Sequence, residues 1–194
     1  MTPKSLRLYI FITCFTHYSI RYIWAVPLLR GGGVNIDSRF FKVREYFFHH
    51  AEEEQDHWKW IIQNLYDTGY KGSDPRILFP QIPTQAYLSF AMYLAHKQPV
   101  ARLAMGYILE GVSGELGVQY GNKAAQLLGL NKEQMSFFIL HGELDQGHSH
   151  DILDILENAP LSGYDWAWCE YAAKCTVELY KAMYNHAAID YSLV

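Results

Sequence analysis

Residues 141–150 read HGELDQGHSH and contain three histidines and two acids. At about 100° per residue of an α-helix, His141, Asp145 and His148 fall within a sector of about 60°. We expect this sector to face the core, where charged side chains are costly unless they are paired or bind a metal ion. This expectation depends on four apolar residues on or beside the sector: Leu140, Leu144, Ile152 and Ile155. Two polar residues of the stretch should point away from it: Glu143 and His150.

Residues 49–58, HHAEEEQDHW, repeat the same spacing on a second predicted helix, with His50, Glu54 and His57 in the matching positions. Each copy therefore contains a carboxylate three residues before a histidine. Two such pairs on two helices, with glutamates from other helices, form the ligand pattern of a carboxylate-bridged dimetal site in a bundle. Imidazole and carboxylate together suit iron or manganese. The repeated spacing thus predicts an interior dimetal site.

A third predicted helix offers Glu110 within the apolar stretch MGYILEGVSGELG, residues 105–117. A glutamate in such surroundings should have a partner, either a metal ion or a basic residue such as Arg102. The glycines after it are expected to leave space for a pocket. The first helix contributes no acid, so the site would hold more nitrogen and less carboxylate than a ferritin-like site. The candidate ligands are Glu54, His57, Glu110, His141, Asp145, His148 and, as an additional candidate, His50.

Both repeated motifs have a plainer explanation as solvated helix faces stabilised by pairs three and four residues apart. This alternative is stronger for the first motif, because EEEQD at residues 52–56 is acidic all round. The apolar flank of the second motif and the repetition itself favour the metal site.

Almost every segment has helical periodicity, and none shows sustained strand-like alternation. We expect one all-α domain over residues 1–194, a bundle of six to seven helices. The first helix should end near Pro27 and the Gly31–Gly33 break, and Asp37–Ser38, Asn131 and Ser162 should cap later helices. The predicted helices are 5–26, 38–67, 84–97, 99–120, a short turn at 122–128, 132–157 and 163–188.

Composition limits the class of protein. Half of the 194 residues are hydrophobic and 15% are aromatic, which indicates a packed globule, and a net charge of −4 argues against a nucleic-acid partner. The apolar run at residues 8–15 is too short to span a bilayer and lacks a cleavage site, so we expect no membrane partner and no targeting segment. The odd number of cysteines indicates a reducing, cytoplasmic location: Cys14, Cys169 and Cys175.

The segments HHAEEEQDHW, YILEG and HGELDQGH resemble the heme-oxygenase-like diiron oxidases and oxygenases, which are non-heme iron-containing redox enzymes. The resemblance covers residues 40–157 and implies a heme oxygenase-like fold, two Fe(II) ions and O2 as co-substrate. It also implies ligation by Glu110, by His141, Asp145 and His148, and by His57 with an upstream carboxylate. That position is three residues before the histidine in some members, here Glu54, and seven before in others, here His50. We prefer Glu54.

The resemblance implies oxidation of a small amino-acid-like or fatty-acid-like substrate in a biosynthetic pathway. Reactions of such enzymes include alkene formation, C–C or C–N bond cleavage, desaturation, N-oxygenation and nitrile formation from a tryptophan-like amino acid. We further expect a homodimer with a small-molecule substrate. A set of aromatic residues could line a pocket, although each is more often part of a core: Tyr87, Phe90, Tyr93, Tyr107, Trp166, Trp168 and Tyr171.

Two other functions stay open. A metal-free thiaminase-like or quinone-cofactor-oxidase-like enzyme could share the fold, but the thiaminase-like chemistry needs a nucleophilic cysteine, a role to which neither Cys169 nor Cys175 can be matched. A non-catalytic iron-binding bundle of the ferritin type would need a fourth carboxylate helix, and only Glu170 or Glu178 could supply it.

Overall fold

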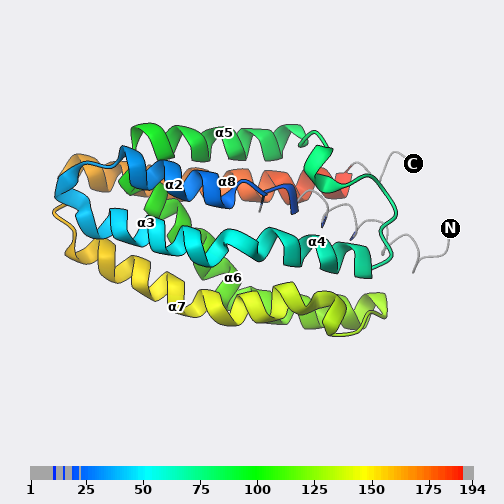
Figure 1. The fold of residues 1–194 in the computed structure, drawn as a ribbon. Coiled ribbons are helices and arrows are strands. Elements are labelled where there is room, and N and C mark those ends of the chain that lie inside the picture. Colours follow the sequence, from blue (N-terminus) through cyan, green and yellow to red (C-terminus); the bar gives the residue numbers. More distant parts are fainter. Residues whose placement is uncertain (1–10, 12–14, 16–18, 22, 190–194) are drawn as a thin grey trace.

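The computed structural model describes residues 11, 15, 19–21 and 23–189, and all regular elements in this part of the chain are helices (Figure 1). The predicted all-α class is therefore confirmed. Most of the predicted helix 5–26, including Cys14, lies outside the described residues. The elements are α2 Ala25–Asn35, η1 Ser38–Phe40, α3 Phe41–Glu53, η2 Glu54–Asp56, α4 His57–Asp67, η3 Pro75–Ile77, α5 Ile82–Lys97, α6 Pro99–Leu128, η4 Glu133–Met135, α7 Ser136–Asn158 and α8 Gly163–Ile189.

Helix α2 passes through Gly31–Gly33, so the helix end predicted at these glycines was wrong, although a turn at Trp24 does precede Pro27. Pro27 lies in the first turn of α2, where a missing N–H costs little. The glycines serve packing, because a Cβ on Gly32 would lie 3.0 Å from the ring of Phe47. The helix therefore continues, and its glycine face lets α2 approach α3 closely.

The predicted helix 38–67 is helical over nearly its whole length but consists of four segments. Asp37 caps the first turn by accepting a hydrogen bond from the backbone N–H of Arg39, as expected. A 3₁₀ turn, η2, then separates α3 from α4 and contains Glu54, while His57 is the first residue of α4. Such tight turns within a helical run often occur at functional sites. In Figure 1 this run extends along the molecule beside α7.

Helix α6 does not end at Gly121 as predicted but continues to Leu128, where Gly129 closes it with a left-handed φ of 70°. Gly121 is helical because it packs against α7. Further along this contact, a Cβ on Gly117 would lie 3.0 Å from the carbonyl oxygen of Phe138 and 3.1 Å from the Cα of Gly142. Of the three glycines expected to leave pocket space, Gly114 and Gly117 instead bring two helix backbones together, whereas nothing lies within 4 Å of a Cβ on Gly111.

Replacing Gly142 with alanine is expected to destabilise the fold by about 1–3 kcal/mol, because overpacking of rigid groups forces backbone shifts. The added Cβ would lie 3.0 Å from the carbonyl oxygen of Ser113 and 3.1 Å from the backbone nitrogen of Val118. Gly147 lies on the same helix with nothing within 4 Å of its Cβ position. Gly147→Ala should therefore keep or gain stability, by up to about 1 kcal/mol. Urea unfolding of both variants tests this, and equal stability would contradict it.

Two later helices begin with the predicted caps. Asn131 and Gln134 exchange hydrogen bonds of 2.8 and 2.9 Å before η4, so that α7 starts at Ser136 instead of residue 132. Ser162 and Asp165 form the corresponding reciprocal pair at the start of α8. In the part of the chain that the structure describes, no helix is both long and apolar enough to cross a membrane.

Candidate metal centre

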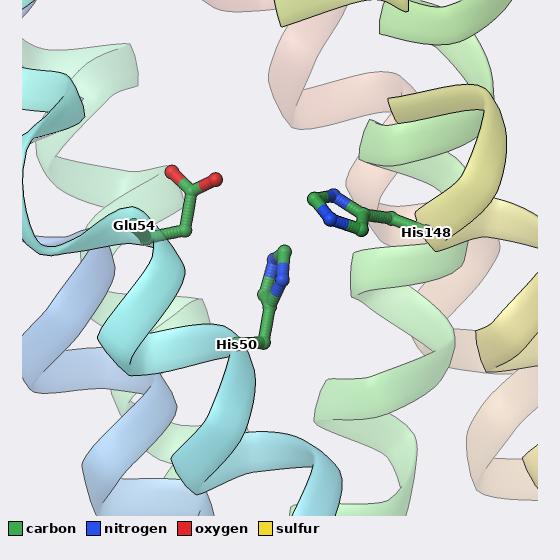
Figure 2. A group of neighbouring side chains, drawn as sticks. All are labelled: His50, Glu54 and His148. Carbon is green, nitrogen blue, oxygen red and sulfur yellow. The ribbon is translucent and has the colours of Figure 1, made fainter. Parts of the chain in front are cut away.

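All seven candidate ligands converge where the α3–α4 run, α6 and α7 meet. Four of them are almost fully buried, and the other three are partly buried. Figure 2 shows His50 and Glu54, from adjoining turns of one helical run, pointing toward His148 on α7. The residues form three overlapping groups whose ligand atoms lie within 4.8 Å of one another: His50/Glu54/His148, Glu54/His57/His141 and Glu110/Asp145/His148. The burial contradicts the alternative of two solvated faces.

The tightest group joins Glu54, His57 and His141. Glu54 Oε1 lies 2.8 Å from His57 Nδ1 and 3.4 Å from His141 Nε2, and the two nitrogens are 3.1 Å apart. Atoms bonded to one metal at about 2.1 Å lie about 3.0 Å apart when adjacent in an octahedron. The three atoms are thus spaced like one face of a coordination shell.

The second group joins Glu110, Asp145 and His148. His148 Nδ1 lies 3.6 Å from both Glu110 Oε2 and Asp145 Oδ1. His50 adjoins this group, because its Nε2 is 3.3 Å from Glu110 Oε1, and its ring stacks on Tyr46 at 5.3 Å. The groups Glu54/His57/His141 and Glu110/Asp145/His148 share no residue. Each of them provides three donor atoms, and His50 lies beside both.

The register of α7 follows from contacts one turn away from the site. Asn64 of α4 accepts a 2.7 Å hydrogen bond from the backbone N–H of Phe137, and Trp60 donates to the Ser136 hydroxyl at 3.0 Å. These contacts fix the first turn of α7 against α4. His141 lies one turn further on and meets His57 as a result, while its Nδ1 contacts Asp145 Oδ2 at 2.7 Å.

Five buried atoms of the site have no hydrogen-bond partner among the described residues: His50 Nδ1, Glu54 Oε1, Glu110 Oε2, Asp145 Oδ1 and His148 Nδ1. Each unsatisfied buried polar group costs about 1–3 kcal/mol. The short Glu54–His57 separation does not change this, because the two groups are not in hydrogen-bond geometry. Orphaned nitrogens and carboxylate oxygens facing one space fit iron, which accepts both kinds of ligand.

The charges of the site are strongly coupled. Burial alone would raise the pKa of Glu54, but the imidazoles of His141 and His57 beside its carboxylate lower it to about 2. Burial alone would lower the pKa of His141, but Asp145 and Glu54 raise it to about 10. Asp145 and Glu110 likewise raise the pKa of His148 to about 10. Without a metal, protons on the imidazoles therefore balance the carboxylates.

Metal uptake is expected to release about two protons per chain near pH 7, one each from His141 and His148, because a protonated nitrogen cannot ligate. Since both pKa values are raised to about 10, apparent affinity should rise with pH across the neutral range and fall as pH falls. Anaerobic calorimetry with Fe(II) in two buffers of different ionisation enthalpy measures the proton count. Binding without proton release would contradict this charge balance.

Several residues lie elsewhere than the sequence suggested. Leu140 and Leu144 are about half exposed, so that flank of α7 does not face the core, although Ile152 does and Glu143 and His150 point outward as expected. Glu110 has imidazole partners, His50 and His148, and no ion pair with Arg102. The ligands of α7 therefore lie on the predicted inward face of the helix, but Leu140 and Leu144 do not lie beside them in the core as expected.

The alternative functions find little support among the described residues. Glu170 and Glu178 pair with surface lysines and offer no fourth carboxylate to the site. Burial raises the pKa of the Cys169 thiol to about 11, and neither this residue nor Cys175 lines the cavity at the site. Within the described ranges, neither a ferritin-type site nor a cysteine nucleophile is assembled.

A cavity of about 50 Å³ adjoins the ligands, and the sequence did not indicate what lines it. Of the seven candidate aromatic residues only Tyr87 lines it, while Tyr107 and Trp166 line a separate surface hollow. Two buried arginines, Arg21 and Arg102, also line the cavity. Their positions depend on contacts distant in sequence, so no local pattern could identify them.

Glu53 is another residue of the site that the sequence did not indicate. Its carboxylate lies 3.5 Å from His50 Nδ1 and 3.6 Å from His148 Nε2 at the rim of the site. A carboxylate behind a metal-binding imidazole typically fixes which ring nitrogen binds. The acidic run EEEQD hid this residue among its neighbours.

Comparisons with known proteins agree with this geometry. The chain is similar over 99% of its length to a domain of unknown function with a heme oxygenase-like fold from Shewanella denitrificans OS217, with a TM-score of 0.84, 22% identity and 81% of that chain covered. No curated protein matches the sequence. Residues 50–180 match the family described as iron-containing redox enzyme. The chain has a heme oxygenase-like fold and belongs to this family of iron-containing redox enzymes.

Proposed function

We propose that this protein is a non-heme diiron oxidoreductase that uses O2 to oxidise a small organic substrate. The observation that carries the proposal is the set of five buried, partnerless ligand atoms on the α3–α4 run, α6 and α7. Four of these atoms belong to two groups that share no residue, Glu54/His57/His141 and Glu110/Asp145/His148, which supports one ion for each group. The fifth belongs to His50, which lies beside both groups. When bound, ferrous ions supply the electrons that O2 accepts and open positions for O2 and substrate.

Side chains of the protein hold the metal ions and orient the ligating rings. Glu54, Glu110 and Asp145 balance metal charge, and Asp145 also fixes the His141 ring through the 2.7 Å contact to Nδ1. Apolar side chains keep water from the space next to the ligands: Leu28, Leu29, Leu103, Leu109 and Ile152. The cavity distinguishes this proposal from iron storage, since a storage site needs no compartment for an organic molecule.

The test is anaerobic titration with Fe(II), followed by O2 and a panel of amino acids and fatty acids. We expect two iron ions per chain and O2 consumption that depends on one class of added compound. Equal O2 uptake with every compound would favour a non-catalytic iron-binding bundle. Hydrolytic activity that survives chelation would favour a metal-free enzyme. Either result would contradict the proposal.

A further inference from the structure

Arg102 is a buried cation without a counter-ion. It lies on α6, is 5% exposed and lines the cavity beside the metal ligands. Its side chain makes no hydrogen bond or ion pair with any residue in the described part of the chain, and its Nε is buried without a partner. A guanidinium stays protonated in proteins. Leaving such a charge buried and unpaired costs several kcal/mol, so the fold retains an unfavourable feature at this point.

No described acid is in contact with Arg102: Glu110 attracts its charge only from a distance and already faces imidazoles. Glu110, two turns further along the same face of α6, lies 3.3 Å from His50 and 3.6 Å from His148. Between Arg102 and Glu110, Gly106 has no side chain, and a Cβ there would be 3.5 Å from Ile152 Cδ1 and 3.7 Å from Arg102 Nη1. Gly106 therefore places no side-chain atom of its own beside the guanidinium.

A second guanidinium faces the same cavity. Arg21 is 8% exposed, and its Nη1 donates a 3.4 Å hydrogen bond to the hydroxyl of Tyr87. Arg21 also lies 5.4 Å from the centre of the Tyr180 ring. Burial lowers the pKa of the Arg102 guanidinium, and the nearby charge of Arg21 lowers it further. Two cationic side chains thus line one cavity, and an anion there would relieve the charge of Arg102.

We propose that Arg102, with Arg21 beside it, binds the carboxylate of the organic substrate, which is therefore a small carboxylic acid. A planar guanidinium matches a carboxylate with two parallel hydrogen bonds. The cavity of about 50 Å³ holds a group of about three to five non-hydrogen atoms, as in a carboxylate with its first carbons. Leucines around it suit an aliphatic chain. The identity of the anion as substrate rests on the proposed function, whereas the anion site itself does not.

The experiment measures thermal unfolding of the full chain, both loaded with Fe(II) without O2 and after chelation. Sodium propionate is compared with propionamide, its neutral analogue, and with phosphate and chloride at equal ionic strength. The variants are Arg102→Met, which removes the charge, Arg102→Lys, which keeps it, and Arg44→Met, a matched change at an exposed arginine of α3.

Propionate alone should raise the unfolding temperature of the original chain and the Arg44→Met variant. Arg102→Met should weaken propionate binding about 10–100-fold, because this is the contribution of one charged hydrogen-bonding group to affinity. Arg102→Lys should weaken it less, because the charge is kept. Without ligand, Arg102→Met should melt about 2–8 °C higher, since it removes an unpaired buried charge. A structural role for Arg102 predicts a lower melting temperature instead.

Three outcomes would overturn the proposal: an equal propionate effect in Arg102→Met, a phosphate effect without a propionate effect, or destabilisation by Arg102→Met with unchanged propionate binding. Iron content separates this test from the proposed function. Arg102→Met should still load two iron ions, because Arg102 contacts none of the ligands. Loss of iron loading in the original chain would contradict the diiron proposal but not the anion site.

Discussion

Replacing Asp145 with alanine is expected to abolish O2-dependent oxidation and to reduce iron retention from two ions per chain to at most one. Asp145 is 1% exposed and is the carboxylate that contacts both groups of ligands. Its Oδ2 holds His141 Nδ1 at 2.7 Å, and its partnerless Oδ1 faces His148 Nδ1 at 3.6 Å. Removing it would free the His141 ring and leave the Glu110/Asp145/His148 group with one carboxylate instead of two. We expect turnover to fall by at least about 100-fold.

The measurement is iron content after anaerobic loading and desalting, together with O2 uptake and helicity by circular dichroism. Glu143→Ala is the matched control, because Glu143 lies on the same helix and is exposed. Asp145→Asn refines the result, since the amide oxygen can still accept from His141 but carries no charge for a metal. Retention of two iron ions and full activity in Asp145→Ala would contradict both the ligand role and the diiron proposal.

The local part of the site could be predicted from the sequence because helical phase depends only on spacing. His141, Asp145 and His148 share one face for that reason, and the structure buries this face as expected. The same reasoning failed for Leu140 and Leu144, which are about half exposed. An apolar residue beside a predicted buried sector does not reveal which neighbouring helix, if any, will cover it.

The parts that sequence could not predict depend on contacts between helices. Glycines at 31–33 and 121 look like helix ends, yet each lies inside a helix. At Gly32, Gly33 and Gly121 an aromatic ring or another helix occupies the space of the missing side chain. Contacts between helices also account for the 3₁₀ turn at Glu54–Asp56 and for the position of Arg21 and Arg102 at one cavity. Local propensity is a weak guide wherever tertiary packing overrides it.

Glu54 and His50 are expected to differ sharply when each is replaced with glutamine. Glu54 belongs to two of the three ligand groups, and its Oε1 is within 2.8 Å of His57 and 3.4 Å of His141. His50 belongs to one group, and its Nε2 faces another side chain of the site, Glu110, at 3.3 Å. Glu54→Gln should therefore lose at least one iron and all O2 uptake. His50→Gln should keep two irons, with affinity lowered about 10–100-fold, as for a residue that orients a ligand.

Anaerobic Fe(II) titrations of both variants decide which residue completes the first group, with Glu52→Gln as the control at an exposed acid of the same run.

The pKa of Glu54, lowered to about 2, means that its carboxylate is ionised at neutral pH. It can accept a cation without losing a proton, whereas the pKa of His50 is raised because Glu110 outweighs the effect of burial. At His50 a proton therefore competes with a metal ion more strongly than at a free imidazole. If His50→Gln lost iron while Glu54→Gln kept it, the order of the two residues would be reversed. The ligand would then be the histidine seven residues before His57.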